Sequence, residues 1–214
     1  MLPRGVYAIA DGSAGRLVLD LVAAFVRGGA AVVQLRWKAS SLSPQASGQL
    51  LDLARAARRI CDRKALFFVN DRPDIALLAG ADGVHLGQED LPLADARRIV
   101  GPKMIIGIST HSDAEIDAAQ GADYIGFGPI FVTHSKPGAP LPPPHGIDGL
   151  RRAVKRSNVP VVAIGGITSK TAADVYAAGA HCVASIADIC SAPDPEAAVR
   201  SLRPVAGGRQ PVAG

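Results

Sequence analysis

The sequence predicts a closed (β/α)8 barrel, an α/β fold in which eight parallel strands alternate with eight helices. Short apolar, β-branched segments recur eight times with helical patterns between them. The apolar segments are continuous, as in parallel strands buried on both faces. A doubly wound open sheet is the alternative, but none of the eight segments is charged enough, or interrupted enough by proline, to indicate an edge strand.

The elements are expected in strict alternation. Strands are predicted at residues 6–10, 31–35, 65–69, 83–86, 104–108, 124–127, 159–164 and 182–186. Helices are predicted at residues 17–30, 48–60, 75–81, 92–101, 114–122, 149–157, 171–180 and 194–202. The phrases "GGAAVVQL", "AGADGVHLG", "QGADYIGFG" and "AGAHCVASI" each end a helix in glycine and lead directly into a buried strand. This repetition indicates serial βα units.

The bulk properties favour one domain over residues 1–206, followed by a flexible tail over 207–214. The 214 residues carry a net charge of +4 without any basic run, which argues against nucleic-acid binding. Three cysteines without CxxC spacing argue against a disulfide framework and against zinc. No segment resembles a signal peptide or a membrane span, so we expect a cytoplasmic protein with no membrane partner. A homo-oligomer is compatible with these properties.

Two acidic residues follow neighbouring predicted strands. Asp71 comes after "FFVN" and Asp90 after "VHLGQE", so in a barrel both would lie at the carboxyl end of the strands. Two unpaired carboxylates at this distance repel each other unless a cation lies between them. Hard oxygen ligands without a His or Cys cluster favour Mg²⁺. The alternative is that each aspartate caps the helix that follows.

Gln34, Arg36 and Lys38 alternate along the second predicted strand and therefore share one face, with Trp37 on the other. Two cations at the end of a buried strand favour an anion as partner, and phosphate is the natural one. A salt bridge to Asp71 or Asp90 is the alternative.

Two further segments suggest anion binding. "VVAIGGIT" combines a strand, a glycine pair and a helix start, and its backbone N–H groups can hold a phosphate, with Gly166 expected at the closest approach. The connection over residues 133–146 is long enough for a lid, and it carries Thr133, Ser135 and Lys136 at its strand-proximal end. His85 and His111 receive no chemical role, because a lone histidine near a strand is more often a packed residue.

Several motifs in order resemble thiamine-phosphate synthases: "VQLRWK", "FFVNDRPDIALLAGADGVHLGQEDLP", "GISTH", "GADYIGFGPIFVTHSK" and "VPVVAIGGIT". The resemblance implies a (β/α)8 barrel that joins a pyrimidine diphosphate to a thiazole phosphate with Mg²⁺ and releases pyrophosphate. It implies Mg²⁺ ligands at Asp71 and Asp90, and catalytic roles for Arg36, Lys38 and Lys136. It implies substrate binding by Gln34, Leu35, Arg36, Trp37, Lys38, Asn70, Ser109, Thr133, His134, Ser135, Lys136, Gly166, Ile186 and Ala187.

The chain departs from the family pattern at Trp37, usually acidic, at Ser135, usually Thr, and at Ala187, usually Ser. The loop after Lys136 is also unusual. Two alternatives follow. A related thiazole tautomerase carries a catalytic histidine where this chain has Pro129, which counts against it. A barrel that binds a phosphate ligand without catalysis is the other.

Overall fold

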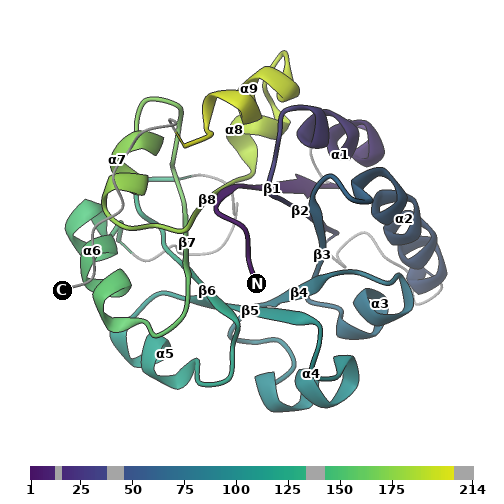
Figure 1. Ribbon diagram of the computed structural model, residues 1–214, viewed down its shortest axis with the longest axis horizontal. Helices are drawn as coiled ribbons and strands as arrows, with labels where there is room; N and C mark the ends of the chain where they lie inside the picture. Colours follow the sequence, from purple (N-terminus) through teal and green to yellow (C-terminus); the bar gives the residue numbers. More distant parts are fainter. Residues whose placement is uncertain (13–15, 38–45, 134–142, 205–214) are drawn as a thin grey trace.

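The computed structural model describes residues 1–12, 16–37, 46–133 and 143–204. Its strands form one closed parallel barrel in sequence order, which confirms the predicted fold class (Figure 1). The strands are β1 (Gly5–Asp11), β2 (Val32–Arg36), β3 (Leu66–Asn70), β4 (Gly83–Leu86), β5 (Ile105–Thr110), β6 (Tyr124–Phe127), β7 (Val161–Ile164) and β8 (Cys182–Ser185). β7 begins two residues later than expected, because Pro160 has no N–H to donate to the ladder, and β5 ends two residues later than expected, at Thr110.

The helices form a ring around the barrel (Figure 1). They are α1 (Val18–Arg27), α2 (Ala46–Cys61), α3 (Pro73–Leu78), α4 (Leu93–Val100), α5 (Asp113–Ala118), α6 (Gly146–Arg156), α7 (Ala172–Ala177), α8 (Ala187–Cys190) and α9 (Pro195–Ser201). The described part of the chain thus has nine helices rather than the expected eight. The additional one, α8, has four residues, which is too short for a helical periodicity to be recognised in the sequence.

Side chains alternate between two apolar layers. On β2, Val33 and Leu35 belong to the outer core between strands and helices, whereas Val32 belongs to the barrel interior. The interior cluster consists of Leu2, Tyr7, Ile9, Val32, Phe68, Tyr124, Val162, Cys182 and Ala184. Because the period along a strand is two, the same alternation directs Gln34 and Arg36 inward.

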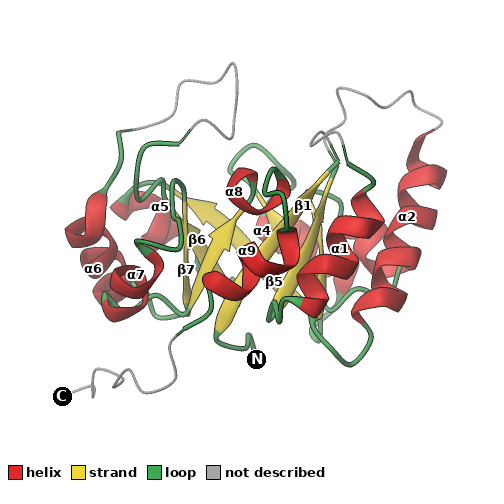
Figure 2. Ribbon diagram, turned by 90° about the horizontal axis from the view of Figure 1, so that it is seen from above, coloured by secondary structure: helices red, strands yellow, loops and turns green. Residues whose placement is uncertain are grey.

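The two ends of the barrel are distinct. Figure 2 shows the barrel from the side with the N-terminus at one end. Leu2 closes that end: it is 4% exposed, packs in the interior cluster, and its carbonyl oxygen lies 2.8 Å from His181 Nε2. The carboxyl ends of the eight strands meet at the other end, which we call the mouth.

The expected domain boundary at residue 206 and the tail over 207–214 lie outside the described residues. Among the residues that the structure describes, no helix combines the length and the apolar character needed to cross a membrane.

Candidate active site

A buried ion pair joins the ends of β1 and β2 at the mouth. Arg36 Nη1 donates to Asp11 Oδ2, and the two residues lie directly opposite each other in the parallel ladder. Their side chains are only 10% and 8% exposed. The expected alternative, a salt bridge from Arg36 to Asp71 or Asp90, is therefore wrong in its partner, because the carboxylate comes from β1.

The ion pair changes the argument for phosphate at this position. Asp11 neutralises much of the Arg36 charge, so a buried arginine no longer requires an external anion by itself. The guanidinium group has five N–H donors, however, and one carboxylate does not occupy them all. The pair therefore orients Arg36 at the mouth while donors are left for a ligand.

The other face of β2 points away from the interior, as predicted for Trp37. Trp37 packs against the outer core, and a Cβ atom on Gly12 would lie 2.4 Å from the indole ring. Leu35 is buried in the same outer core. Both residues can therefore contact a ligand in the barrel only through their backbone. Lys38 lies outside the described residues.

Five interior side chains form a continuous hydrogen-bonded chain across the barrel. Gln34 Nε2 donates to Tyr7 Oη at 2.8 Å, and Tyr7 Oη lies 2.8 Å from Tyr124 Oη. Tyr124 Oη lies 2.8 Å from His85 Nδ1, and His85 Nε2 lies 2.9 Å from Ser109 Oγ. The chain joins Gln34 on β2 to Ser109 on β5, two positions at which substrate binding is predicted.

Asp71 and Asp90 follow the neighbouring strands β3 and β4 toward the mouth. Asp71 has a left-handed backbone with φ of 63°, and its N–H donates to His85 O at 2.8 Å. Asp90 Oδ2 accepts from the Gly87 N–H at 2.6 Å. The helix-cap alternative is wrong, because the N-cap residues of α3 and α4 are Arg72 and Pro92.

The donor set at these aspartates fits Mg²⁺. A left-handed conformation is uncommon at residues other than glycine, although aspartate adopts it more readily than most, and such residues cluster at functional positions. The described residues contain no group of three or more His, Cys, Asp or Glu side chains that could hold a metal. Mg²⁺ needs only one or two carboxylates, because water and phosphate oxygens complete its coordination.

The glycine pair after β7 lies against the segment that follows β6. Gly165 and Gly166 have φ of 99° and 63°, and a Cβ atom on Gly166 would lie 2.4 Å from Val132 O. Phe131 N donates to Gly165 O at 3.0 Å. Crowding and backbone conformation thus explain both glycines, and phosphate binding at Gly166 stays a prediction.

The other predicted thiazole-phosphate positions are only partly visible. Ile186 is the N-cap residue of α8, and Ala187 is its first residue and is exposed. Thr133 ends the described segment after β6, and His134, Ser135 and Lys136 lie outside the described residues, as does most of the expected lid. Where that connection becomes described again, His145 N donates to Pro129 O at 2.9 Å, which holds the start of α6 against the end of β6.

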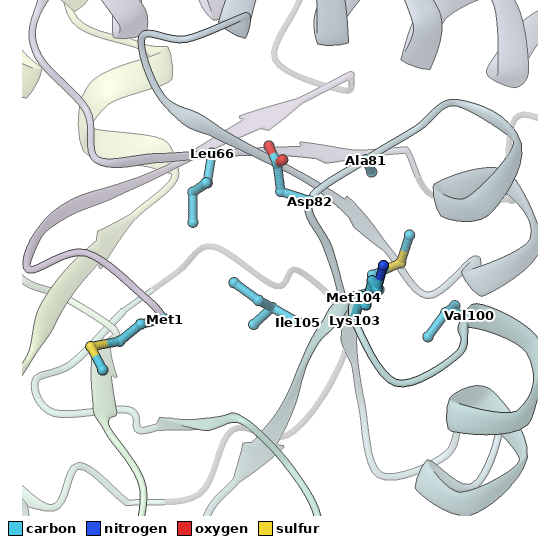
Figure 3. Close-up of a pocket in the computed structure, with 8 residues that line it drawn as sticks. All are labelled: Met1, Leu66, Ala81, Asp82, Val100, Lys103, Met104 and Ile105. Atoms are coloured by element: carbon cyan, nitrogen blue, oxygen red, sulfur yellow. The ribbon is translucent and has the colours of Figure 1, made fainter.

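A pocket of about 390 Å³ lies at the opposite end of the barrel (Figure 3). It is lined by Met1, Leu66, Ala81, Asp82, Val100, Lys103, Met104 and Ile105. Leu66 and Ile105 are the first residues of β3 and β5, so the pocket faces the amino ends of the strands. Asp82 accepts from Phe67 N at 2.8 Å and forms an ion pair with Arg58 at 3.8 Å. Both interactions give this carboxylate a structural role. Active sites of parallel barrels form at the other end.

Four residues of the mouth and interior escaped the sequence analysis. Asp11 ends β1 just as Asp71 follows β3, so the same signal, a carboxylate after an apolar strand, would have identified it. Tyr7 and Tyr124 carry hydroxyl groups within apolar strands, which is a weak signal because most buried tyrosines serve packing. His85 was assigned no role, yet it contacts both Tyr124 and Ser109. The pairing of these residues depends on barrel closure and strand register.

Comparison with known proteins gives consistent matches. The family model "Thiamine monophosphate synthase" matches residues 6–189. The chain is 42% identical over 205 residues to the thiamine-phosphate synthase of Anaeromyxobacter dehalogenans, covering 93% of this chain and 86% of that protein. It is 48% identical over 186 residues, 86% of the chain, to the thiamine biosynthesis bifunctional protein ThiM/ThiE of Symbiobacterium thermophilum, of which the match spans 37%.

A solved structure agrees. Thiamine phosphate pyrophosphorylase from Pyrococcus furiosus superposes with a TM-score of 0.81 at 34% identity, over 94% of this chain and 93% of that one. The similarity therefore extends over the whole barrel.

Proposed function

The chain belongs to the thiamine monophosphate synthase family, and we propose that it performs the synthase reaction. In this reaction 4-amino-2-methyl-5-hydroxymethylpyrimidine diphosphate is coupled to 4-methyl-5-(2-phosphoethyl)thiazole, or its carboxylated form, and pyrophosphate is released. The observation that carries the proposal is the match over residues 6–189, which includes every strand end that contributes a polar residue to the mouth.

The reaction needs a stabilised leaving group more than a base. The bond between the pyrimidine methylene carbon and the diphosphate oxygen breaks, and both electrons leave with pyrophosphate. The remaining carbocation is delocalised into the aminopyrimidine ring. The lone pair of the thiazole nitrogen then forms the new C–N bond, so no proton has to be removed.

The residues at the mouth suit these requirements. Arg36, fixed by Asp11, offers guanidinium donors to the diphosphate, and Lys38 and Lys136 are proposed to add positive charge there. Ser109 and Asn70 offer polar side chains at the ends of β5 and β3. Thr133 and Ser135, with the backbone of Gly166, Ile186 and Ala187, are the proposed contacts of the thiazole phosphate.

We include Mg²⁺ in the proposal, with Asp71 and Asp90 as its protein ligands. When bound, the ion would neutralise charge on the diphosphate oxygens. Asp71 supports this assignment through its left-handed backbone at the end of β3, and Asp90 through its position after the neighbouring strand. The Gly87 N–H donates to only one oxygen of Asp90 and so fixes the orientation of that carboxylate.

Location and assembly stay predictions. All three cysteines, Cys61, Cys182 and Cys190, are buried free thiols, and burial raises the pKa of each. Free buried thiols agree with a reducing compartment such as the cytoplasm. Light scattering on the purified chain measures whether it forms a homo-oligomer.

The test is product formation by the purified protein. With both substrates and Mg²⁺, we expect thiamine phosphate and pyrophosphate in equal amounts, and loss of both when a chelator is added. Isomerisation of a thiazole phosphate without coupling would instead identify a tautomerase. Binding of both substrates without release of pyrophosphate would identify a barrel that has lost catalysis.

A further inference from the structure

The direction of hydrogen-bond donation along the interior chain from Gln34 to Ser109 can be assigned by counting protons. Burial raises the pKa of Tyr7 and of Tyr124 above the ordinary value for a phenol, so each keeps its single hydroxyl proton at physiological pH. Gln34 Nε2 donates to Tyr7 Oη, and between Tyr7 and Tyr124 either hydroxyl group could be the donor. In the direction that gives every hydroxyl proton of the chain an acceptor, Tyr7 donates to Tyr124. Tyr124 then donates its hydroxyl proton to His85 Nδ1.

The same direction assigns the tautomer of the His85 imidazole. In this direction His85 Nδ1 accepts from Tyr124, so the imidazole would carry its single proton on Nε2. That proton is donated to Ser109 Oγ. The Ser109 hydroxyl proton is then left for an acceptor at the mouth. At the other end, Gln34 keeps its carbonyl oxygen as an acceptor.

The two ends of the chain are coupled because each hydroxyl group has one proton. Turning the Gln34 amide by half a rotation would make its oxygen the acceptor from Tyr7 and would reverse every bond up to Ser109. Ser109 would then offer its lone pairs rather than its proton. The orientation of the Gln34 amide on β2 therefore determines whether Ser109 on β5 offers a hydrogen-bond donor or an acceptor.

The interior is shaped to hold these rings. A Cβ atom on Gly107 would lie 1.9 Å from the Tyr124 ring, and one on Gly126 would lie 3.1 Å from His85 Cε1. The His85 and Tyr124 rings are stacked with centroids 5.6 Å apart, and the Tyr7 and Tyr124 centroids are 5.9 Å apart. Two glycines on β5 and β6 thus provide the space that keeps the chain in one geometry.

We propose that His85, Tyr124 and Tyr7 are positioning residues that make Ser109 a hydrogen-bond donor and the Gln34 carbonyl an acceptor at the mouth. The role assigned to Ser109 rests on the proposed function. Diphosphate oxygens only accept hydrogen bonds, so the direction that leaves the Ser109 proton available is the one that suits this ligand. The Gln34 carbonyl suits a donor such as the exocyclic amino group of an aminopyrimidine.

The first test uses the ligand-free protein and needs no activity. In a long-range ¹H–¹⁵N spectrum of protein with ¹⁵N-labelled histidine, His85, assigned by its loss in His85→Asn, should be neutral with its proton on Nε2. In Tyr124→Phe the donor to Nδ1 is gone, and we expect this single tautomer to be lost. A proton on Nδ1 in the wild-type protein would overturn the proposal.

The second test is kinetic. Tyr124→Phe should lower kcat/KM for the pyrimidine diphosphate by about 10-fold, the effect of losing one positioned hydrogen bond. Adding Tyr124→Phe to Ser109→Ala should cost little more, because the chain acts through Ser109. Tyr176→Phe is the matched control, since Tyr176 is also a buried tyrosine but packs in the outer core.

Two outcomes would contradict the proposal: equal kinetics for Tyr124→Phe and Tyr176→Phe, or full additivity of Tyr124→Phe with Ser109→Ala. If Tyr124→Phe does not fold, the wild-type histidine spectrum still decides the direction of the chain. A proton on Nε2 in a protein without any turnover would support the direction while refuting the proposed function.

Discussion

The two ends of the barrel differ in what they offer a ligand. The amino end has the pocket of about 390 Å³, but its lining is mostly aliphatic. The carboxylate of Asp82 in this lining accepts from the Phe67 N–H and pairs with Arg58. The mouth brings together side chains from β1 to β5 that are far apart in sequence, including the Asp11–Arg36 pair and Ser109. The comparison teaches that convergence of polar groups, and not free volume, locates the site.

The difference follows from parallel topology. Every strand of the barrel runs in the same direction, so residues that follow a strand reach the mouth and residues that precede it reach the amino end. At the amino end the preceding residues close the interior, as Leu2 does. We therefore expect substitutions at the mouth to change activity and substitutions at the amino end to change stability.

The largest effect is expected at the proposed metal ligands. Asp71→Ala and Asp90→Ala should each lower Mg²⁺-dependent turnover by about 10²- to 10³-fold, as when a charge-stabilising group is removed. Asp71→Asn tests the charge alone, because asparagine tolerates the left-handed backbone. Steady-state kinetics over a range of Mg²⁺ concentrations measures the effect.

Asp95→Ala is the matched control for these variants, since Asp95 is an acid in the first turn of α4 whose side chain is 50% exposed. Circular dichroism should show that all four proteins fold. Full activity in either alanine variant would mean that the metal assignment is wrong.

The buried ion pair should have the next largest effect. Asp11→Ala leaves the Arg36 charge buried without its carboxylate, and we expect the free energy of unfolding to fall by about 3–5 kcal/mol. Urea denaturation measures this. The double variant Asp11→Ala/Arg36→Met removes both charges and should recover most of the stability, yet it should remain inactive. Recovered turnover in the double variant would remove Arg36 from the site.

The amino end should show the opposite behaviour. Leu2→Ala removes a side chain from the interior cluster and should lower the free energy of unfolding by about 2–3 kcal/mol. We expect kcat at saturating substrate to stay within about twofold of the wild type, since single changes away from a site usually act on stability. A large loss of kcat in a folded Leu2→Ala protein would contradict the division between the two ends.

The smallest effect is expected within the pocket itself. Lys103 is exposed at its rim, and Lys103→Ala should change kcat/KM by less than about twofold and stability by less than about 0.5 kcal/mol. The same assays apply. A strong rise in KM for either phosphorylated substrate would place anion binding in the pocket and reverse the comparison.

Local patterns were sufficient to predict the barrel. Each strand is a continuous apolar segment, and a glycine ends several of the preceding helices, so the alternation of elements could be read along the sequence. The helix α8 was missed because Ala187–Cys190 is shorter than any periodic signal. β7 starts later than predicted because Pro160 lacks a backbone N–H. The prediction followed the apolar segment, which extends through this proline.

The site was harder to predict because its contacts join distant strands. Sequence analysis selected Arg36 correctly as an inward residue, but it gave Arg36 the wrong acidic partner, since only register places Asp11 opposite it. It likewise passed over His85, whose position between Tyr124 and Ser109 depends on three strands packing around one interior. Periodicity along one strand carries no information on such pairs.

The most direct test of the location of the site is a crystal structure of the protein with pyrophosphate and Mg²⁺. The account predicts pyrophosphate at the mouth, with Arg36 donating to it and the metal ion between Asp71 and Asp90. Pyrophosphate bound beside Asp82 and Lys103, with an empty mouth, would contradict the account.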